Sequence, residues 1–313
     1  MRYSGIGGQA VMEGIMMKNA DKYSVAVRKP DNEIEVKVED YNLGQRFKTI
    51  RKLPILRGVF SFIDSLYLGM STLMYSASFF EEEQEDSDST ETLSEEEKAK
   101  KEAKEKKEND VLMAGTVVVS VVMAIAIFFA LPYFLSTFFQ KFISSDVVIA
   151  LLEGIIRLAI FIVYILLISL TPDIKRVFMY HGAEHKCINC IEHGLELNVE
   201  NVRKSSKLHK RCGTSFLIIV MLVSIVFFMF IRVDSKLLRL VLRLILIPVI
   251  AGVSYEFIRL AGRYDNPIVD LFSKPGLWMQ RITTKEPDDD MIEVGIASVE
   301  AVFDWKAWQK EEG

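Results

Sequence analysis

The stretch Val111–Phe139, VLMAGTVVVSVVMAIAIFFALPYFLSTFF, decides the fold class of this 313-residue chain. It contains no charged residue, and its one proline is Pro132. At about 1.5 Å per helical residue, the stretch is longer than the roughly 30 Å hydrocarbon core of a bilayer. The sequence therefore predicts a first transmembrane helix over 111–139, with a kink at Pro132.

Two further segments predict spans on either side of a long polar connection. Residues 213–231 are uncharged and predict the third span. Residues 147–171 predict the second span, although they carry Glu153 and Arg157. These two side chains are four residues apart, so they lie on one helix face and can neutralise each other.

A fourth span is predicted over 237–258. This segment carries Arg239 and Arg243 in its first two turns, from where both side chains are expected to snorkel to the membrane surface. The expected fold is therefore a mainly α, polytopic membrane protein. It has about four transmembrane helices, an interfacial helix and a small cytosolic β-hairpin.

The connections between the spans predict their orientation. Residues 172–212 hold eight Lys and Arg, whereas 140–146 and 232–236 hold one and two. Basic residues are retained on the cytosolic side of a membrane. We therefore expect a multi-pass protein with both termini and the 172–212 connection in the cytosol.

Residues 1–54 are expected to form a cytosolic segment with a glycine-rich start and a β-hairpin. Apolar and polar residues alternate in 23–28 and 33–39, and the turn residues Pro, Asp and Asn occupy 30–32. The glycines of 5–14 have neither a preceding strand nor the Lys-Ser/Thr pair of a phosphate-binding loop. We expect them to allow close packing of the backbone instead.

Two more segments flank the predicted spans. Residues 55–80 are apolar and aromatic but carry Arg57 and Asp64, which favours an interfacial or re-entrant helix over a fifth span. Residues 259–313 are expected to form a cytosolic tail. Acidic residues at 288–290 predict the start of a C-terminal helix in that tail, because they suit a helix N-terminus.

The charge distribution excludes several protein classes. The chain has 38 Lys and Arg and 42 Asp and Glu, a formal net charge of −4. Residues 81–110 alone hold 14 acidic and 6 basic side chains, and we expect this insert to be disordered or a solvated charged helix. The rest of the chain is weakly basic without a basic stripe, which argues against a nucleic-acid partner.

Three cysteines favour a reducing compartment over a disulfide scaffold, and the first ten residues lack the apolar core of a cleaved signal peptide.

All histidines and cysteines lie between His181 and Cys212. On a helix, His181 and His185 would share one face and could bind one metal ion such as Zn²⁺, with Glu184 as a general base. The order H-x-x-E-H is that of the inverted zinc peptidases. A third ligand must come from elsewhere in the chain, and the predicted candidates are Glu256 and then Glu13.

A second metal hypothesis is a structural zinc site, in which two ligands come from each half of the connection. Two simpler interpretations stay open. The connection can be rich in His and Glu because it faces headgroups and water, and Cys212 can be a small buried apolar residue. A cysteine nucleophile is the least favoured, because no motif places a base beside a thiol. The four candidate zinc ligands are Cys187, Cys190, His209 and Cys212.

Eight motifs occur in order along the chain: GGQAVMEG (7–14), LRG (56–58), EGIIRL (153–158), YHGAEHK (180–186), RCGTSF (211–216), PVIAG (248–252), SYE (254–256) and PGLW (275–278). With these motifs the chain resembles the DUF1385 family, the YqhQ-like bacterial membrane proteins, over nearly its whole length outside 81–110. The resemblance implies a protein of the bacterial cytoplasmic membrane. The family is labelled as predicted metal-dependent enzymes, a label that rests on the His/Glu motif.

The resemblance also sorts the candidate ligands. Cys187 and Cys190 lie outside the family pattern, which weakens the four-ligand zinc hypothesis. The candidates that fall on the pattern are His181, Glu184, His185, His209 and Cys212.

Two functions from different classes follow. The preferred expectation is a non-enzymatic, oligomeric membrane protein that assists membrane biogenesis beside the protein-translocation machinery, the Sec translocon, with the lipid bilayer as its environment. The alternative is a metal-dependent hydrolase that acts through the HxxEH residues at the cytosolic membrane surface, on a lipid or a membrane protein. Transport is disfavoured, because the first and third spans hold no ionisable residue.

Overall fold

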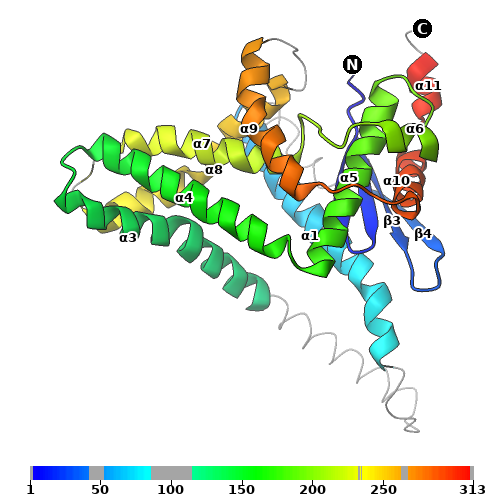
Figure 1. The fold of residues 1–313 in the computed structure, drawn as a ribbon, viewed down its shortest axis with the longest axis horizontal. Coiled ribbons are helices and arrows are strands. Elements are labelled where there is room, and N and C mark those ends of the chain that lie inside the picture. The colour runs from blue at the N-terminus through cyan, green and yellow to red at the C-terminus, as the bar shows by residue number, and fades with distance from the viewer. Residues whose placement is uncertain are drawn as a thin grey trace.

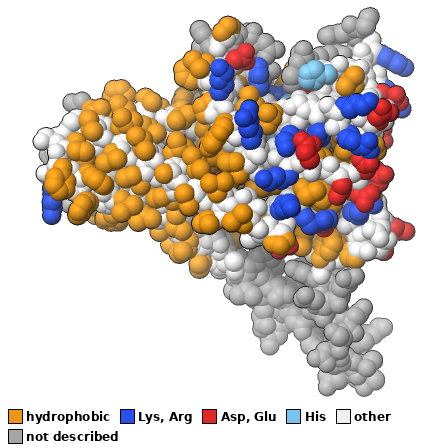
Figure 2. Space-filling model, in the orientation of Figure 1, with side chains coloured by type: hydrophobic (Ala, Val, Ile, Leu, Met, Phe, Trp, Pro, Cys, Tyr) orange, Lys and Arg blue, Asp and Glu red, His pale blue; other side chains and the backbone are white. Residues whose placement is uncertain are grey.

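The computed structural model describes residues 3–41, 53–85, 115–231, 233, 235–261 and 267–310. Figure 1 shows an elongated helical bundle joined to a part that contains the β-sheet and both chain ends. In Figure 2 the bundle surface is almost uniformly hydrophobic, whereas Lys, Arg, Asp and Glu gather over the part with the sheet. This division is the one expected for a protein that is partly embedded in a membrane.

The N-terminal sheet has four antiparallel strands in the order β1-β2-β3-β4. The predicted hairpin is confirmed as β3 and β4, and the glycine-rich start adds two strands that the sequence did not predict. Glu13 and Ala20 lie in the two-residue turns of the added hairpins and adopt positive φ angles of 47° and 51°. The strands are β1 (Gly7–Val11), β2 (Gly14–Asn19), β3 (Lys22–Arg28) and β4 (Ile34–Asp40).

Helices cover both faces of the sheet. On one face, α5 (Pro172–Glu192) and α10 (Asp289–Val302) bury a core that includes Ile15 and Met17 of β2. The Oγ atoms of Ser24 and Ser298 lie 2.9 Å apart in this core, linking the sheet to α10. On the other face, aromatic side chains of α1 (Leu56–Glu85) pack against the alternate residues of the same strands. Two short helices, α6 (Val199–Lys204) and α11 (Trp305–Lys310), complete this part.

Helix α1 (Leu56–Glu85) connects the sheet with the bundle (Figure 1). Its first turns pack tightly on α8 (Lys236–Ala261), where a Cβ atom on Gly58 would lie 2.9 Å from the Cα of Gly252. Its later turns cover the sheet. The helix predicted over 55–80 is therefore present. Most of the acidic insert 81–110 lies outside the described residues, since α1 is described only as far as Glu85.

The bundle consists of the helical segment Gly115–Lys141, α4 (Asp146–Ile168), α7 (Gly213–Met229), α8 (Lys236–Ala261) and α9 (Pro267–Thr283). Within the described residues, three of these are long and apolar enough to cross a membrane: Gly115–Lys141, α4 and α8. Helix α7 is also apolar but has 17 residues. Four predicted spans thus form helices, and three of them have the length of a span.

Pro132 lies where the first of these helices becomes irregular. The π-helical turn η3 (Ala126–Ala130) precedes α3 (Leu131–Phe138), which begins around Pro132, and η4 (Phe139–Lys141) ends the segment. Proline has no N–H for the carbonyl of residue 128. That carbonyl instead accepts a hydrogen bond of 2.9 Å from Nε of Arg157 on α4. The irregular turn therefore joins two helices of the bundle.

The bundle buries three charged side chains at one place. Glu153 accepts hydrogen bonds from Arg157 at 2.8 Å and from Arg243 of α8. The predicted Glu153–Arg157 pair is therefore confirmed. The prediction that Arg243 snorkels is wrong, because Arg243 faces α4 and is 4% exposed. Burial of this second cation is possible because the same carboxylate serves both arginines.

Candidate metal centre

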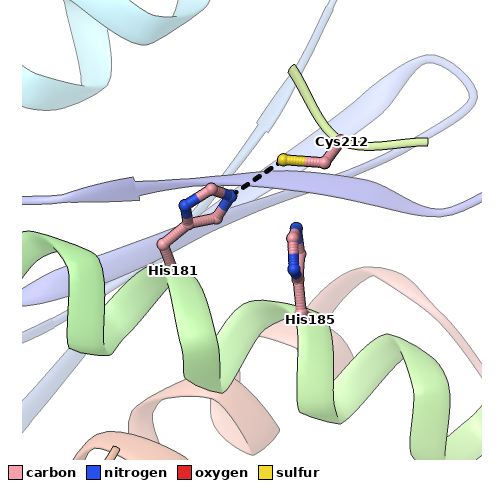
Figure 3. Close-up of side chains that lie close together, drawn as sticks. All are labelled: His181, His185 and Cys212. Carbon is pink, nitrogen blue, oxygen red and sulfur yellow. Dashed lines mark hydrogen bonds between the residues drawn. The ribbon is translucent and has the colours of Figure 1, made fainter. Parts of the chain in front are cut away.

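Helix α5 carries the H-x-x-E-H residues at its middle, where it is buried against the sheet and α10. Because His181 and His185 are one turn apart, their rings lie on the same face with centroids 4.4 Å apart. Figure 3 shows both rings projecting from α5 toward Cys212, which lies on a separate segment. The predicted helical placement of the two histidines is therefore present in the structure.

Gly182 explains how the chain passes so close to this helix. A Cβ atom at position 182 would lie 2.0 Å from the carbonyl oxygen of Lys285. The N–H of Lys285 donates to the carbonyl of Phe178 at 2.8 Å. Only glycine permits this approach, which brings the carbonyl of Thr283 to the ring of His181.

Both histidines are held by backbone carbonyls. Nδ1 of His181 lies 2.9 Å from the oxygen of Thr283, and Nδ1 of His185 lies 2.6 Å from the oxygen of Lys207. A carbonyl oxygen can only accept, so Nδ1 carries the proton in each ring. Nε2 of each ring is then the nitrogen turned away from the backbone, and in His181 it lies 3.1 Å from Sγ of Cys212. A metal ion bound here would take the place of the proton on Nε2, which is the arrangement that metal-binding histidines use.

Cys212 completes the group from the N-cap position of α7. Its Sγ atom lies 3.1 Å from Nε2 of His181 and accepts from the N–H of Thr214 at 3.3 Å. Burial opposes ionisation of the thiol, but the two imidazoles outweigh burial and hold the pKa of Cys212 well below its usual value. Burial also opposes the imidazolium of His181, yet the Cys212 thiolate raises the pKa of His181 to about 9. The two imidazoles therefore favour the ionised form of the sulfur, which is the form that binds a metal or acts as a nucleophile.

Glu184 lies beside both rings. Its Oε2 atom is 3.8 Å from Nε2 of His181 and 3.7 Å from Nε2 of His185. The side chain is buried and packs against Gly8 of strand β1, where a Cβ atom would lie 2.9 Å from Cγ of Glu184. The Glu184 carboxylate therefore lies beside the three ligand atoms.

The structure places the two predicted third ligands elsewhere. Glu256 pairs with Arg57, whose Nε lies 2.5 Å from Oε1, and also accepts from the N–H of Ile55. Glu13 pairs with Arg176 at 2.5 Å. Both carboxylates are neutralised by arginine, and neither is grouped with the histidines. Cys212 occupies the position for which the sequence predicted an acid.

The four residues of the structural zinc hypothesis do not come together either. Cys190 donates to the carbonyl of Glu196 at 3.4 Å, and His209 faces Glu192 at 3.5 Å. Burial raises the pKa of Cys187 well above its usual value, so this thiol stays neutral in the core. Among the described residues, the group of three ligand atoms within 4.8 Å of one another is formed by His181, His185 and Cys212.

Polar side chains fix the segment that carries Cys212. Gln280 of α9 accepts from the N–H of His209 at 2.8 Å and donates to its carbonyl at 2.7 Å. Glu192 accepts from the N–H of Ser4 at 2.9 Å and pairs with Arg211. These supporting residues were missed by the sequence analysis. The only sequence feature that pointed to them was a polar side chain, Glu192 or Gln280, on an otherwise apolar helix face.

The three ligand residues and Glu184 line a cavity of about 780 Å³. It lies between the sheet and α5 on one side and α1, α7 and α8 on the other, where the charged and hydrophobic parts of the molecule meet. Most of its remaining wall is apolar. Its lining includes Gly8, Met16, Phe62, Leu66, Leu68, Ile188, Phe216, Leu217 and Ile258.

Comparisons with known proteins place this chain beside one family. The family model described as "Protein of unknown function (DUF1385)" matches residues 53–305. The chain is also 35% identical over 293 residues to "Uncharacterized protein YqhQ" of Bacillus subtilis (strain 168), covering 93% of this chain and 90% of that protein. No solved structure matches the chain significantly.

Proposed function

The chain belongs to the DUF1385 family, and from that premise we propose that it is a metal-dependent hydrolase of the membrane surface. The proposed ligands are His181, His185 and Cys212. The observation that supports this most is the convergence of their three ligand atoms within 4.8 Å of one another, with each imidazole fixed through Nδ1. Catalytic zinc sites use three protein ligands and keep one position open.

The chemistry of the donor set fits Zn²⁺. Two imidazoles and a thiolate are ligands that zinc prefers, and metal–ligand bonds of about 2.0–2.3 Å put tetrahedral ligand atoms roughly 3.3–3.6 Å apart. The distance of 3.1 Å between Nε2 of His181 and Sγ of Cys212 is close to that value. A divalent ion bound here would supply Lewis-acid polarisation of a substrate oxygen and a lowered pKa for a water molecule.

Glu184 is the proposed general base. Its carboxylate lies beside the ligand atoms and is buried, so it can accept a proton from a water molecule in the cavity. The water oxygen adds to a carbonyl or phosphoryl centre of the substrate. Glu184 then returns the proton to the leaving group, whose bond to that centre breaks. The sum is addition of one water molecule across one bond.

A second chemistry is supported by one observation, the contact of 3.1 Å between His181 and Cys212. An ionised cysteine beside an imidazole is the arrangement of a cysteine nucleophile. In that case His181 takes part in proton transfer, and the same cavity binds the substrate. The sequence disfavoured this chemistry because no motif places a base beside a thiol.

The proposed placement is the bacterial cytoplasmic membrane with both termini in the cytosol. Three helices have the length and composition of spans, and we propose that α7 is a fourth, shorter one. The eight basic residues of 172–212 support a cytosolic position for α5. The cavity then lies at the cytosolic membrane surface.

The competing proposal is the non-enzymatic one, an oligomeric protein that assists membrane biogenesis beside the translocon. The hydrophobic surface of the bundle is compatible with it. It gives no task to the three converging ligand atoms or to Glu184, and for this reason we rank it second.

Metal analysis of the detergent-purified full chain tests the proposal. We expect one Zn²⁺ per chain in the wild type and in Glu184→Gln, and loss of the metal in His185→Ala. His193→Ala is the matched control, because His193 is exposed at the end of the same helix. Metal-free wild type that still functions in the cell would overturn the metal centre. Selective alkylation of Cys212 in that metal-free protein would then identify it as the reactive thiol.

A further inference from the structure

Side chains of α1 and α7 form one wall of the cavity. Phe62 of α1 and Phe216 of α7 both line the cavity, and their ring centroids are 5.5 Å apart. This ring pair lies between two helices that are far apart in the sequence.

Two exposed leucines belong to this wall. Leu66 and Leu217 line the cavity and are 56% and 39% exposed. Their neighbours on α1, Ile63 and Tyr67, are 53% and 56% exposed. The exposed apolar surface of α1 therefore adjoins the apolar residues of the same helix that line the cavity. In the proposed membrane placement, lipid chains lie against this surface.

The inside of the cavity changes from apolar to polar. Met16 and Ile188 line it at depth, where they are 2% and 1% exposed, and the His/Glu/Cys group lines it as well. A volume of about 780 Å³ suits a small amphiphile or one chain of it. A protein helix is about 10–12 Å wide with its side chains, so even two turns would overfill the space.

We propose that the substrate is a membrane lipid whose acyl chain enters sideways from the bilayer, between α1 and α7. The chain occupies the apolar depth near Met16 and Ile188, and the polar linkage of the lipid lies beside Glu184 and Cys212. This inference rests on the proposed hydrolase function and specifies its substrate class. It assigns the Phe62–Phe216 pair as the lateral portal.

Photo-crosslinking tests the route. The full chain is reconstituted in phosphatidylethanolamine and phosphatidylglycerol vesicles that contain a phospholipid with a diazirine on one acyl chain, and adducts are mapped by peptide mass spectrometry. We expect adducts at Met16 or Ile188 in addition to the outer face of α1. Adducts confined to the outer face would overturn the proposal.

Two tryptophan variants sharpen this test. Leu66→Trp fills the wall and should abolish the interior adducts while the outer adducts persist. Ile63→Trp adds the same bulk at an exposed position that does not line the cavity, and should keep both sets. Interior adducts that survive Leu66→Trp, or that both variants lose, would contradict entry between α1 and α7.

Failure of the lipid-substrate proposal can be distinguished from failure of the hydrolase proposal. Interior adducts in a protein that binds no metal would support the lipid site and reject the metal centre. Stoichiometric metal with outer adducts alone would reject the lipid substrate and leave the metal centre standing. Glu184→Gln should give wild-type adducts, because it removes a charge and not the apolar depth.

Discussion

Two groups of buried ionisable side chains lie in this protein, one in the bundle and one at the cavity. In the bundle, Glu153 accepts hydrogen bonds from Arg157 and Arg243. Arg157 also donates to the carbonyl of Phe128 and to Oγ of Ser224, at 2.9 Å each. At the cavity, the imidazoles use Nδ1 for backbone carbonyls, and Nε2 of His181 lies 3.1 Å from Sγ of Cys212.

The two groups differ in how their polar atoms are used. In the bundle group, Arg157 uses all three side-chain nitrogens within the protein and Arg243 donates to Glu153, so that the group links α4, α7 and α8. The cavity group instead brings Nε2 of the two imidazoles and the sulfur of Cys212 within 4.8 Å of one another. Buried charge alone therefore does not indicate a ligand site. The proposed metal centre is supported by ligand atoms that converge in a cavity.

The largest expected effect is a loss of hydrolytic activity when the cavity group is changed. Glu184→Gln should lower hydrolysis of a para-nitrophenyl ester of a long-chain fatty acid in mixed micelles by roughly 10²–10⁴-fold, because the general base is removed. Its metal content should not change. The control Glu200→Gln alters an exposed carboxylate paired only with Lys204. Equal rates in Glu184→Gln and the control would refute the assigned role of Glu184.

The second effect concerns stability. Glu153→Ala should destabilise the protein by about 3–5 kcal/mol, because two buried arginines lose their shared anion. Thermal unfolding in detergent measures this, with Arg239→Ala as the control, since Arg239 bonds to the carbonyl of Val233 outside the group. Metal bound by the folded protein should be unchanged. Loss of metal before unfolding would show that the two groups are coupled.

A smaller effect is expected from the backbone that supports the metal ligands. Gly182→Ala should push the chain at Lys285 away and weaken the bond between Thr283 and His181. The expected loss of zinc affinity is roughly 10–100-fold, measured by competition with a chelator. Gly7→Ala is the control, because a methyl group there meets nothing within 4 Å. Unchanged affinity in Gly182→Ala would show that this hydrogen bond does not orient the ligand.

The smallest effect is a pH dependence at Glu192. Burial opposes its ionisation, but the hydrogen bond from His209, the charge of Arg211 and the donors of Ser4 lower its pKa to about 2. A carboxylate with a lowered pKa contributes stability above its unfolded pKa of about 4.3, and this contribution is lost as the pH falls toward 2. Thermal unfolding of Glu192→Gln should therefore depend less on pH between these values. Parallel pH profiles for the variant and the wild type would contradict this.

Local geometry explains which parts could be predicted from sequence. The spacing of His181 and His185 is set by one helix, and alternation along 23–28 and 33–39 is enough to predict their hairpin. The strands β1 and β2 were missed because their glycines and methionines do not alternate in polarity. Their pairing is imposed by α5 and α1 on the two faces of the sheet.

Contacts between distant segments explain the errors. Glu256 was chosen as a ligand from its position at a helix end, but Arg57, far away in sequence, neutralises it. Arg243 was expected at the membrane surface from its place near the start of a span. Its direction depends on how α8 is rotated against α4, and no sequence pattern revealed that. Cys212 reaches His181 only because α7 begins beside α5.

The central claim is that two imidazoles and one thiolate form a metal centre. X-ray absorption spectroscopy at the zinc edge of the purified wild type tests it most directly. We predict one sulfur neighbour at about 2.3 Å and two imidazole nitrogens at about 2.0–2.1 Å, with the sulfur absent in any zinc retained by Cys212→Ser. A protein without zinc, or zinc surrounded only by nitrogen and oxygen in the wild type, would contradict it.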